Sequence, residues 1–394
     1  MSMGAAQPEA QEVASRDSKP RRRQLWPLWI LMLILLGIAI YFLRFDLRSY
    51  AVLTHFTDPQ ASGPLLRWET HAVTSEEISI PSANGPVPAR LYIPVGVAHP
   101  HGMVAVHGIH HLGMDEPRLM SFSRAVAGSG LAVLTPQIDS LADYHVDGAS
   151  IPIIGESAAW LDQRLGNGPV TVTGISFGGG LSLLATCDPR YGPHVRALVL
   201  MGAYDDLARV SRFLATSQEE LPDGRTVPYA AHDYGASVFV YAHLDQFFPA
   251  GDLAVAHEAL RDWLWEHPEK AQPLLEKLSS QSRATMDALL NRRIEEVRPQ
   301  ILSAIQIDEP ELEAISPLGH LDNLHVPVYI LHGSADNIIP PAESLWLEKD
   351  VPREDLRAVL ITGAFSHVDP EKHPPVLEEL RLVHFVGDVL RAAN

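Results

Sequence analysis

The sequence predicts an α/β protein with a mostly parallel central sheet, helices on both faces of that sheet, a helical cap insertion and one preceding transmembrane helix. Short apolar runs of strand type alternate with amphipathic stretches of helical type, which is typical of a parallel sheet covered on both faces. Helical stretches alone fill residues 206–317, and an uncharged run stands near the N-terminus. With 394 residues, 46% of them hydrophobic, the chain has enough apolar side chains for a large core.

Residues 25–43 (LWPLWILMLILLGIAIYFL) contain no charge and are long enough to cross a bilayer as a helix. The basic residues before this run are Arg16, Lys19, Arg21, Arg22 and Arg23. The positive-inside rule therefore predicts that the basic tail, residues 1–24, is cytoplasmic and that the large domain lies on the non-cytoplasmic side. A cleaved signal peptide, with SYA at 49–51 as its cleavage site, is the alternative. A buried soluble helix is disfavoured because the run has no polar face.

The strand signals begin with an antiparallel pair. EEISIPS and ARLYIPV flank the turn signal ANGP at residues 83–86. Further strands are predicted, with helical stretches between most of them, at residues 103–108, 131–136, 170–174 and 196–202. These elements make residues 70–205 the first half of the predicted core.

Residues 206–317 show helical spacing of apolar residues and no convincing strand. We expect this block to be a cap inserted over the carboxyl edge of the sheet, with a separately folded helical domain as the alternative. The core pattern resumes in residues 318–394, with strands at 327–333 and 357–363 and a closing helix from about 376 to 392.

The motif GISFG, residues 174–178, lies where an apolar strand gives way to a helix. A sharp strand-to-helix turn holds its serine in strained backbone geometry and exposes the hydroxyl of Ser176 at the end of the sheet. The flanking Gly174 and Gly178 have no Cβ atoms to collide with neighbouring backbone. A phosphate-binding loop would have Lys after its glycines, whereas Leu181 follows here.

A serine hydroxyl is a poor nucleophile at neutral pH and needs a histidine base that a carboxylate orients. Asp336 follows an apolar strand in LHGSADNIIP, and His367 follows the next strand in GAFSHVDP. The order Ser176, Asp336, His367 is the one expected for this strand-turn-helix motif. Asp205 and Asp206, after the strand at 196–202, are alternative sources of the acid.

Four sequence contexts in this order, VHGIHH, GISFGG, LHGSADNIIP and GAFSHVDP, resemble the α/β-hydrolase superfamily over about residues 70–205 and 315–394. The resemblance implies that Ser176 is the nucleophile, Asp336 the orienting acid and His367 the general base and acid.

The same resemblance implies an oxyanion hole formed by the backbone N–H groups of Ile109 and Phe177. The chain departs from the three-glycine form of the first loop, because His110 and His111 follow Ile109. His110 is therefore an alternative to Ile109 as a donor. Two adjacent histidines on a loop are too few to indicate a metal site.

These observations predict a membrane-anchored serine hydrolase that cleaves a carboxylic ester or related acyl bond through an acyl-enzyme on Ser176. The substrate would be a small-molecule or lipid-like acyl compound, and neither a metal nor an organic cofactor is required. Peptidase, thioesterase, lipase and acyltransferase activities stay open, as does an inactive membrane-tethered scaffold.

Charge and cysteine content exclude other classes of protein. The net charge of −18 argues against nucleic acid as a partner. The single cysteine, Cys187, excludes an intrachain disulfide and a cysteine-based zinc site. Nothing in the sequence indicates an oligomeric state.

Overall fold

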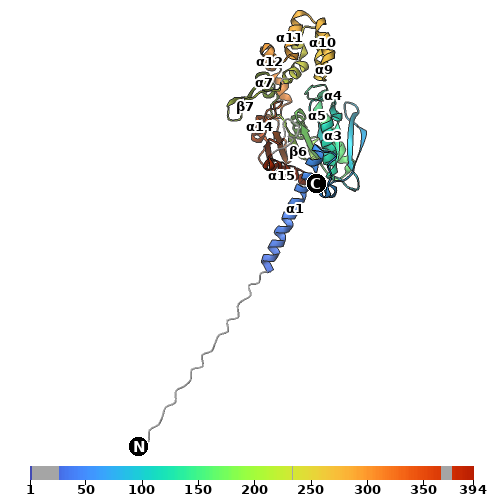
Figure 1. Cartoon of the computed structure of the whole chain (residues 1–394), viewed down its shortest axis with the longest axis vertical. Helices are drawn as coiled ribbons and strands as arrows, with labels where there is room; N and C mark the ends of the chain where they lie inside the picture. The colour runs from blue at the N-terminus through green and yellow to red at the C-terminus, as the bar shows by residue number, and fades with distance from the viewer. Residues whose placement is uncertain (2–25, 233, 365–374) are drawn as a thin grey trace. The chain divides into compact units, whose positions relative to one another are not determined.

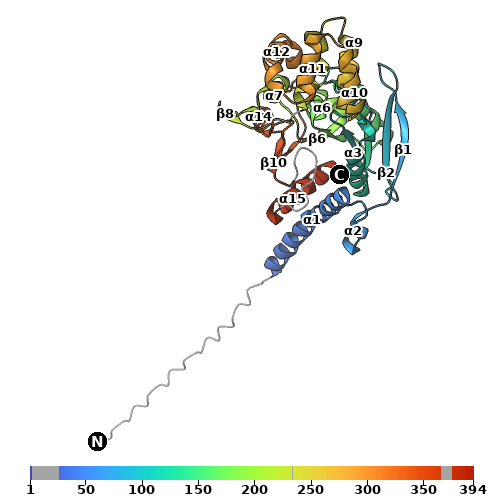
Figure 2. The same ribbon diagram turned by 45° about the horizontal axis from the view of Figure 1, so that its top comes forward.

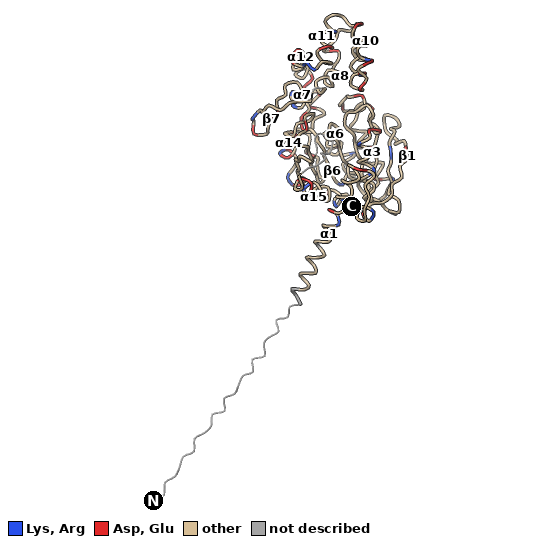
Figure 3. The backbone as a smooth tube through the Cα atoms, viewed as in Figure 1, with Lys and Arg blue, Asp and Glu red and all other residues tan. Residues whose placement is uncertain are grey.

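The computed structural model describes Met1 and residues 26–232, 234–364 and 375–394, and the chain divides into two compact units, residues 1–43 and 44–394. Helix α1 (Trp26–Thr57) begins in the first unit and ends in the second. Its segment Trp29–Thr57, with a mean hydropathy of 2.2, is the one helix among the described residues that is long and apolar enough to cross a membrane. Along the sequence of α1 the first Lys, Arg, Asp or Glu is Arg44, and Figure 3 accordingly draws most of the lower part of this helix in tan.

The second unit is built on an eight-stranded sheet of order β1-β2-β4-β3-β5-β6-β9-β10 (Figure 1). β2 pairs antiparallel with both β1 and β4, and every other pairing in this sheet is parallel. The predicted mostly parallel sheet with an antiparallel opening is thus confirmed. The strands are β1 (Val73–Ile80), β2 (Val87–Pro94), β3 (Gly102–Val106), β4 (Ala132–Pro136), β5 (Val170–Ile175), β6 (Val195–Met201), β9 (Val328–Gly333) and β10 (Leu356–Thr362).

Side chains alternate between the two faces of the sheet, and helices cover both. Along β3, Val104 and Val106 pack on one face, whereas Met103 and Ala105 pack on the other. The first face is covered by α5 (Ser150–Leu165), α6 (Phe177–Cys187) and α14 (Ala342–Asp350). The second is covered by the end of α1, by α3 (Pro117–Gly128) and by α15 (Val376–Ala393).

The second face brings the last part of α1 against α15. Phe45 and Val52 of α1 belong to the same buried cluster as Leu390 and Ala393 of α15. The two helices approach closely, since a Cβ atom on Gly387 would lie 2.6 Å from Asp46 Oδ1. Short segments connect the core elements: α2 (Pro64–Glu69), η1 (Gly113–Asp115), α4 (Asp139–Ala142) and η2 (Gly192–His194).

Between β6 and β9 the chain forms a set of helices that gather at one end of the second unit in both views (Figures 1 and 2). They enclose an apolar cluster, and most of its residues belong to this insertion. The helices are α7 (Leu207–Thr216), α8 (Gly235–Ala242), η3 (Leu244–Gln246), α9 (Leu253–Leu264), α10 (Pro268–Leu274), η4 (Leu275–Lys277), α11 (Ser280–Leu290), α12 (Ile294–Ile307) and α13 (Glu309–Ala314).

The insertion also contains a two-stranded antiparallel sheet, β7 (Gln218–Glu220) and β8 (Thr226–Pro228). The sequence predicts no strand in this region. Each of these strands has three residues, which is too short for an alternating apolar pattern to be visible.

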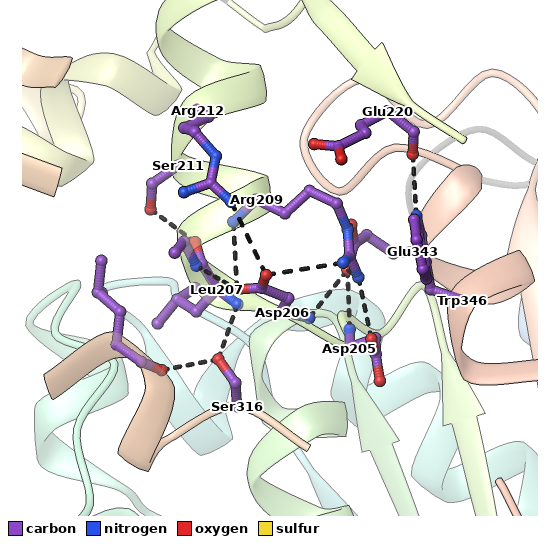
Figure 4. Close-up of polar contacts among 12 residues, drawn as sticks. Asp205, Asp206, Leu207, Arg209, Ser211, Arg212, Glu220, Ser316, Glu343 and Trp346 are labelled. Atoms are coloured by element: carbon purple, nitrogen blue, oxygen red, sulfur yellow. Dashed lines mark hydrogen bonds and ion pairs between the residues drawn. The ribbon is translucent and has the colours of Figure 1, made fainter. Parts of the chain in front are cut away.

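A buried cluster of charges links the insertion to the core (Figure 4). Arg209 on α7 donates to Glu343 on α14 (Nε to Oε1, 2.6 Å) and to Asp205 after β6 (Nη2 to Oδ2, 2.9 Å). Glu343 Oε2 also accepts the backbone N–H groups of Asp205 and Asp206. Because Asp205 and Glu343 have no exposed surface, each carboxylate depends on these partners. The cluster therefore fixes where the insertion leaves the sheet.

Candidate functional site

Ser176 occupies the turn between β5 and α6 in a conformation that is rare for a residue with a side chain. Its backbone has φ 55° and ψ −131°, in the region that favours glycine. Two hydrogen bonds hold it there: its N–H donates to Met201 O (2.8 Å), and its carbonyl oxygen accepts the N–H of Gly179 (2.8 Å). Strain held in this way by the surrounding structure is typical of functional turns.

The glycines beside Ser176 allow the turn to pack tightly. A Cβ atom on Gly174 would lie 2.5 Å from Gly179 Cα, and one on Gly178 would overlap the carbonyl oxygen of His107. Both neighbours are backbone atoms, which cannot move aside as a flexible side chain can. The sequence GISFG therefore suits a close approach between β5, α6 and the loop after β3.

The hydroxyl of Ser176 is buried beside that loop. Only 4% of the residue is exposed, and within the described part of the chain its Oγ has no hydrogen-bond partner. A Cβ atom on Gly108 would lie 2.8 Å from Ser176 Cβ and 3.3 Å from Oγ. The backbone at residue 108 thus passes directly against the hydroxyl. Buried hydroxyls are usually paired, so the lack of a partner within residues 26–232, 234–364 and 375–394 calls for an explanation.

His107 fixes the orientation of this loop. Its Nε2 accepts the N–H of Ile138 (3.1 Å), so the proton of the neutral ring lies on Nδ1, which donates to Gly108 O (2.8 Å). Burial lowers the pKa of His107 to about 4, which keeps the ring neutral. Because the C=O and N–H of a trans peptide point in opposite directions, the N–H of Ile109 points away from His107.

The two N–H donors predicted from the sequence belong to the residues that come directly after Gly108 and Ser176. Ile109 follows Gly108, and Phe177 follows Ser176 as the first residue of α6. The first N–H groups of a helix have no partner within the helix and carry its positive dipole end. Each predicted donor peptide thus directly follows one of two residues that lie against each other, Gly108 and Ser176.

Asp336 is fully buried after the end of β9. Its Oδ1 accepts the N–H groups of Ile338 (2.9 Å) and Ile339 (3.1 Å), and its Oδ2 lies 3.4 Å from His332 Nε2. The contact with His332 was not predicted from the sequence. It arises because His332 lies at the end of the strand and Asp336 follows four residues later. His367, the predicted base, lies outside the described residues.

The alternative acids have other partners. Asp205 contacts Arg209 in the buried charge cluster, and Asp206 caps α7 by accepting the N–H groups of Ala208 and Arg209. Burial and the nearby charge of Glu343 raise the pKa of Asp205 to about 7, although Arg209 opposes this shift. Both carboxylates are thus engaged in joining the insertion to the core.

A cavity of about 620 Å³ brings the neighbours of these residues together. Ile175 precedes the serine and Asn337 follows the acid, and both line the cavity together with Gly108 and Ile109. Phe56 of α1 also lines it. The insertion contributes His232, Tyr234, Trp263, Leu264, Glu266 and Arg292. Motif reasoning missed Phe56 and the insertion residues because none of them belongs to a motif.

His110 lines this cavity and stacks on His111, with ring centroids 4.7 Å apart, and His111 stacks in turn on Trp265 at 5.8 Å. Burial lowers the pKa of both histidines. Among the residues that the structure describes, no three His, Cys, Asp or Glu side chains are grouped to hold a metal ion. The stack suits a wall that contacts an apolar or planar group.

A sequence profile described as alpha/beta hydrolase fold matches residues 150–371, more than half of the chain. The chain belongs to the α/β-hydrolase fold family. Membership of this family supports a hydrolase, and the strand order, the strained Ser176 and the insertion after β6 fit it. No curated protein matches the chain in sequence.

Several solved structures of this fold are similar at low identity. The esterase domain of a Rhodothermus marinus protein shares 15% identity with a TM-score of 0.43, covering 81% of this chain and 97% of its own. A Pyrobaculum calidifontis esterase shares 18% identity with a TM-score of 0.45, covering 93% and 99%. A Pyrococcus horikoshii acylaminoacyl peptidase shares 12% identity with a TM-score of 0.42, covering 77% and 39%. The family assignment rests on the profile match.

Proposed function

We propose that this α/β hydrolase is a membrane-anchored serine hydrolase that cleaves a carboxylic ester or related acyl bond through an acyl-enzyme on Ser176. The observation that carries the proposal is the buried hydroxyl of Ser176 on a strained turn, with the backbone of Gly108 against it and no hydrogen-bond partner for it among the described residues. His367 is the proposed base, and Asp336 the residue that orients it.

The proposed reaction has two acyl-transfer steps. Ser176 Oγ attacks the carbonyl carbon while His367 takes its proton, and the leaving alcohol departs with that proton. The anionic oxygen of each tetrahedral intermediate accepts the N–H groups of Ile109 and Phe177, and one such donor contributes about 3–4 kcal/mol. Water, activated by His367, then cleaves the acyl-enzyme and releases the acid. The step needs no metal or organic cofactor.

Helix α1 is the proposed anchor, with a cytoplasmic basic tail and the hydrolase unit on the other side of the membrane. The structure supports retention over cleavage at SYA. Ser49 and Ala51 are 0% and 2% exposed and lie inside helix α1, about two turns before its end, whereas a processing site must be accessible and extended. N-terminal sequencing of protein from membranes tests this: a new terminus at Val52 would refute retention.

Covalent labelling tests the catalytic proposal. We expect a fluorophosphonate probe to label the full-length protein in bilayer nanodiscs and to fail with Ser176→Ala. Ser237→Ala is a matched control, because Ser237 is also a buried serine with no partner for its hydroxyl among the described residues. It lies in α8, however, on an ordinary helix, so labelling should persist.

The same experiment separates the enzyme from an inactive scaffold. If well-folded wild-type protein resists the probe and hydrolyses no p-nitrophenyl butyrate, the hydrolase proposal is wrong and the scaffold is favoured. If Ser176→Ala is still labelled, the nucleophile lies elsewhere.

A further inference from the structure

The hydrolase unit contains a second and larger cavity, of about 960 Å³, on the face of the sheet covered by α1, α3 and α15. The sheet forms its floor through Met103, Thr173, Val199, Met201 and Leu331. One wall is the last part of α1 and the residues just after it, between Tyr50 and Pro59, and the opposite wall is α15 from Glu379 to Leu390. No motif and no part of the proposed triad accounts for this space.

The walls of this cavity are mostly hydrocarbon. From α15 the lining includes Leu382, Val383, Phe385, Val386, Val389 and Leu390, and α3 adds Phe122 and Val126. A space lined in this way offers few partners to water or to a polar ligand, whereas it removes the surface of an apolar chain from water. The volume lies in the range of small-molecule sites. The chemistry of the walls therefore selects a hydrocarbon group.

This second cavity adjoins the cavity beside Ser176. Phe56, Arg118, Phe122 and Met201 line both of them. The rings of Phe56 and Phe122 meet edge to face at 6.0 Å between centroids. Met201 is also the residue whose carbonyl oxygen accepts the N–H of Ser176. The two cavities therefore adjoin at Met201, the end of the strand whose carbonyl oxygen holds the N–H of Ser176.

The position of the wall in the chain identifies a source for such a group. The wall residues 50–57 follow the apolar run 25–43 after only six residues, about 9 Å of helix. If that run spans a bilayer, as proposed above, the cavity wall is tethered within about two turns of the membrane. Membrane lipids are the abundant esters of long hydrocarbon chains at that location.

We infer that the second cavity holds the hydrocarbon chain of a long-chain acyl ester whose carbonyl group lies at Ser176. This inference rests on the proposed function and specifies its substrate class. The bond from Ser176 Oγ to the acyl carbon forms as the ester C–O bond breaks and the protonated alcohol leaves. Water then hydrolyses the acyl-enzyme and releases a long-chain fatty acid.

Chain-length selectivity tests the inference in the full-length protein in nanodiscs. We expect kcat/KM to rise from p-nitrophenyl butyrate to p-nitrophenyl dodecanoate, by up to about fourfold for each CH₂ group that enters the cavity. Val386→Trp on α15 fills the cavity and should lower the dodecanoate-to-butyrate ratio at least tenfold. Because each variant is compared with wild type in the same nanodiscs, partition of the substrates into lipid cancels.

Leu380→Trp is the matched control, since Leu380 is also on α15 but is 59% exposed and does not line the cavity. It should leave the ratio unchanged. Leu53→Trp fills the cavity from the α1 wall and serves if Val386→Trp fails to fold, as judged by thermal melting. An unchanged ratio in a folded cavity-filling variant would overturn the inference.

A binding experiment separates this inference from the proposed function. Ser176→Ala, which cannot turn over an ester, is irradiated with a diazirine derivative of hexadecanoic acid, and labelled peptides are mapped by mass spectrometry. Labels within 50–59 and 382–390 are expected, and labels confined to 25–43 would refute the cavity site. Cavity labelling without any esterase activity in wild type would refute the proposed function and the ester chemistry at Ser176 but leave the hydrocarbon site standing. Butyrate hydrolysis without cavity labelling would refute only the inference.

Discussion

Gly108→Ala is the smallest change that tests the proposed site, because it adds one methyl group against the nucleophile. The new Cβ atom would lie 2.8 Å from Ser176 Cβ, 3.3 Å from Oγ and 3.3 Å from the carbonyl oxygen of Ile175. Carbon atoms in contact normally lie about 3.5–4.0 Å apart, so the serine or the loop must shift by roughly 1 Å. The φ angle of Gly108 lies outside the left-handed region, so alanine adds no backbone strain.

A displacement of this size has a calculable effect on the reaction. A misplacement of about 1 Å in a catalytic constellation costs roughly 10²-fold in rate. Loss of one oxyanion donor costs about 10²–10³-fold. We therefore expect kcat for p-nitrophenyl butyrate to fall about 10²-fold, equivalent to about 2.7 kcal/mol of transition-state stabilisation.

The assay is steady-state hydrolysis with thermal melting of the same samples. Gly251→Ala is the control, because nothing lies within 4 Å of the position that its Cβ would take and its φ is also outside the left-handed region. It should retain full activity. A Gly108→Ala enzyme with kcat within threefold of wild type would refute the contact between this loop and the nucleophile as the basis of the site.

Other predictions concern the carboxylates and the buried charges. Asp336→Asn should lower kcat about 10⁴-fold by losing the orientation of the base, whereas Asp205→Asn should change kcat less than tenfold; the reverse result would assign the acid to Asp205. Burial holds the pKa of His107 at about 4, below its unfolded value of 6.5. Protein stability should therefore decrease as pH falls from about 6.5 to 4, because the unfolded state binds the proton more readily. His107→Asn should flatten this part of a plot of melting temperature against pH. The pKa of Asp205 is raised to about 7, so its contribution to stability should be lost as pH rises from about 4 to 7, and Asp205→Asn should remove that slope. Arg209→Met leaves the carboxylates of Asp205 and Glu343 buried without a cation and should cost about 3–5 kcal/mol in urea unfolding, while a cost below 1 kcal/mol would contradict the role of the cluster.

The sequence was sufficient for the core because its signals are local. Short apolar runs bounded by turn residues gave the eight strands of the sheet within a few residues, and the glycines of GISFG gave the turn around Ser176. The glycine requirement is a backbone property that a motif records directly. The predicted membrane span ends at residue 43, because the first charge after it is Arg44. In the structure α1 continues to Thr57, and apolar side chains of this continuation pack against the sheet.

The rest of the site depends on contacts between distant parts of the chain. His107, which orients its loop, accepts the N–H of Ile138. Glu343 accepts the N–H of Asp205, which lies 138 residues earlier in the chain. Phe56 reaches the cavity beside Ser176 only because α1 packs beside α3. No spacing rule along the sequence records such pairs, since they arise when the sheet assembles.

The packing of α1 against α15 has a consequence for how the protein is made. His384 lies 3.3 Å from Asp46, a partner 338 residues earlier in the chain, and the apolar cluster of Phe45 and Val52 is completed only by Leu390 and Ala393. At a synthesis rate of ~5–20 residues per second, the ribosome needs roughly 17–68 s to add that length. During that interval the apolar side chains of Phe45 and Val52 stay uncovered and can cause aggregation. The unit can therefore close only after residues 384–393 have been synthesised, and a chaperone that shields residues 44–57 until then would raise its yield.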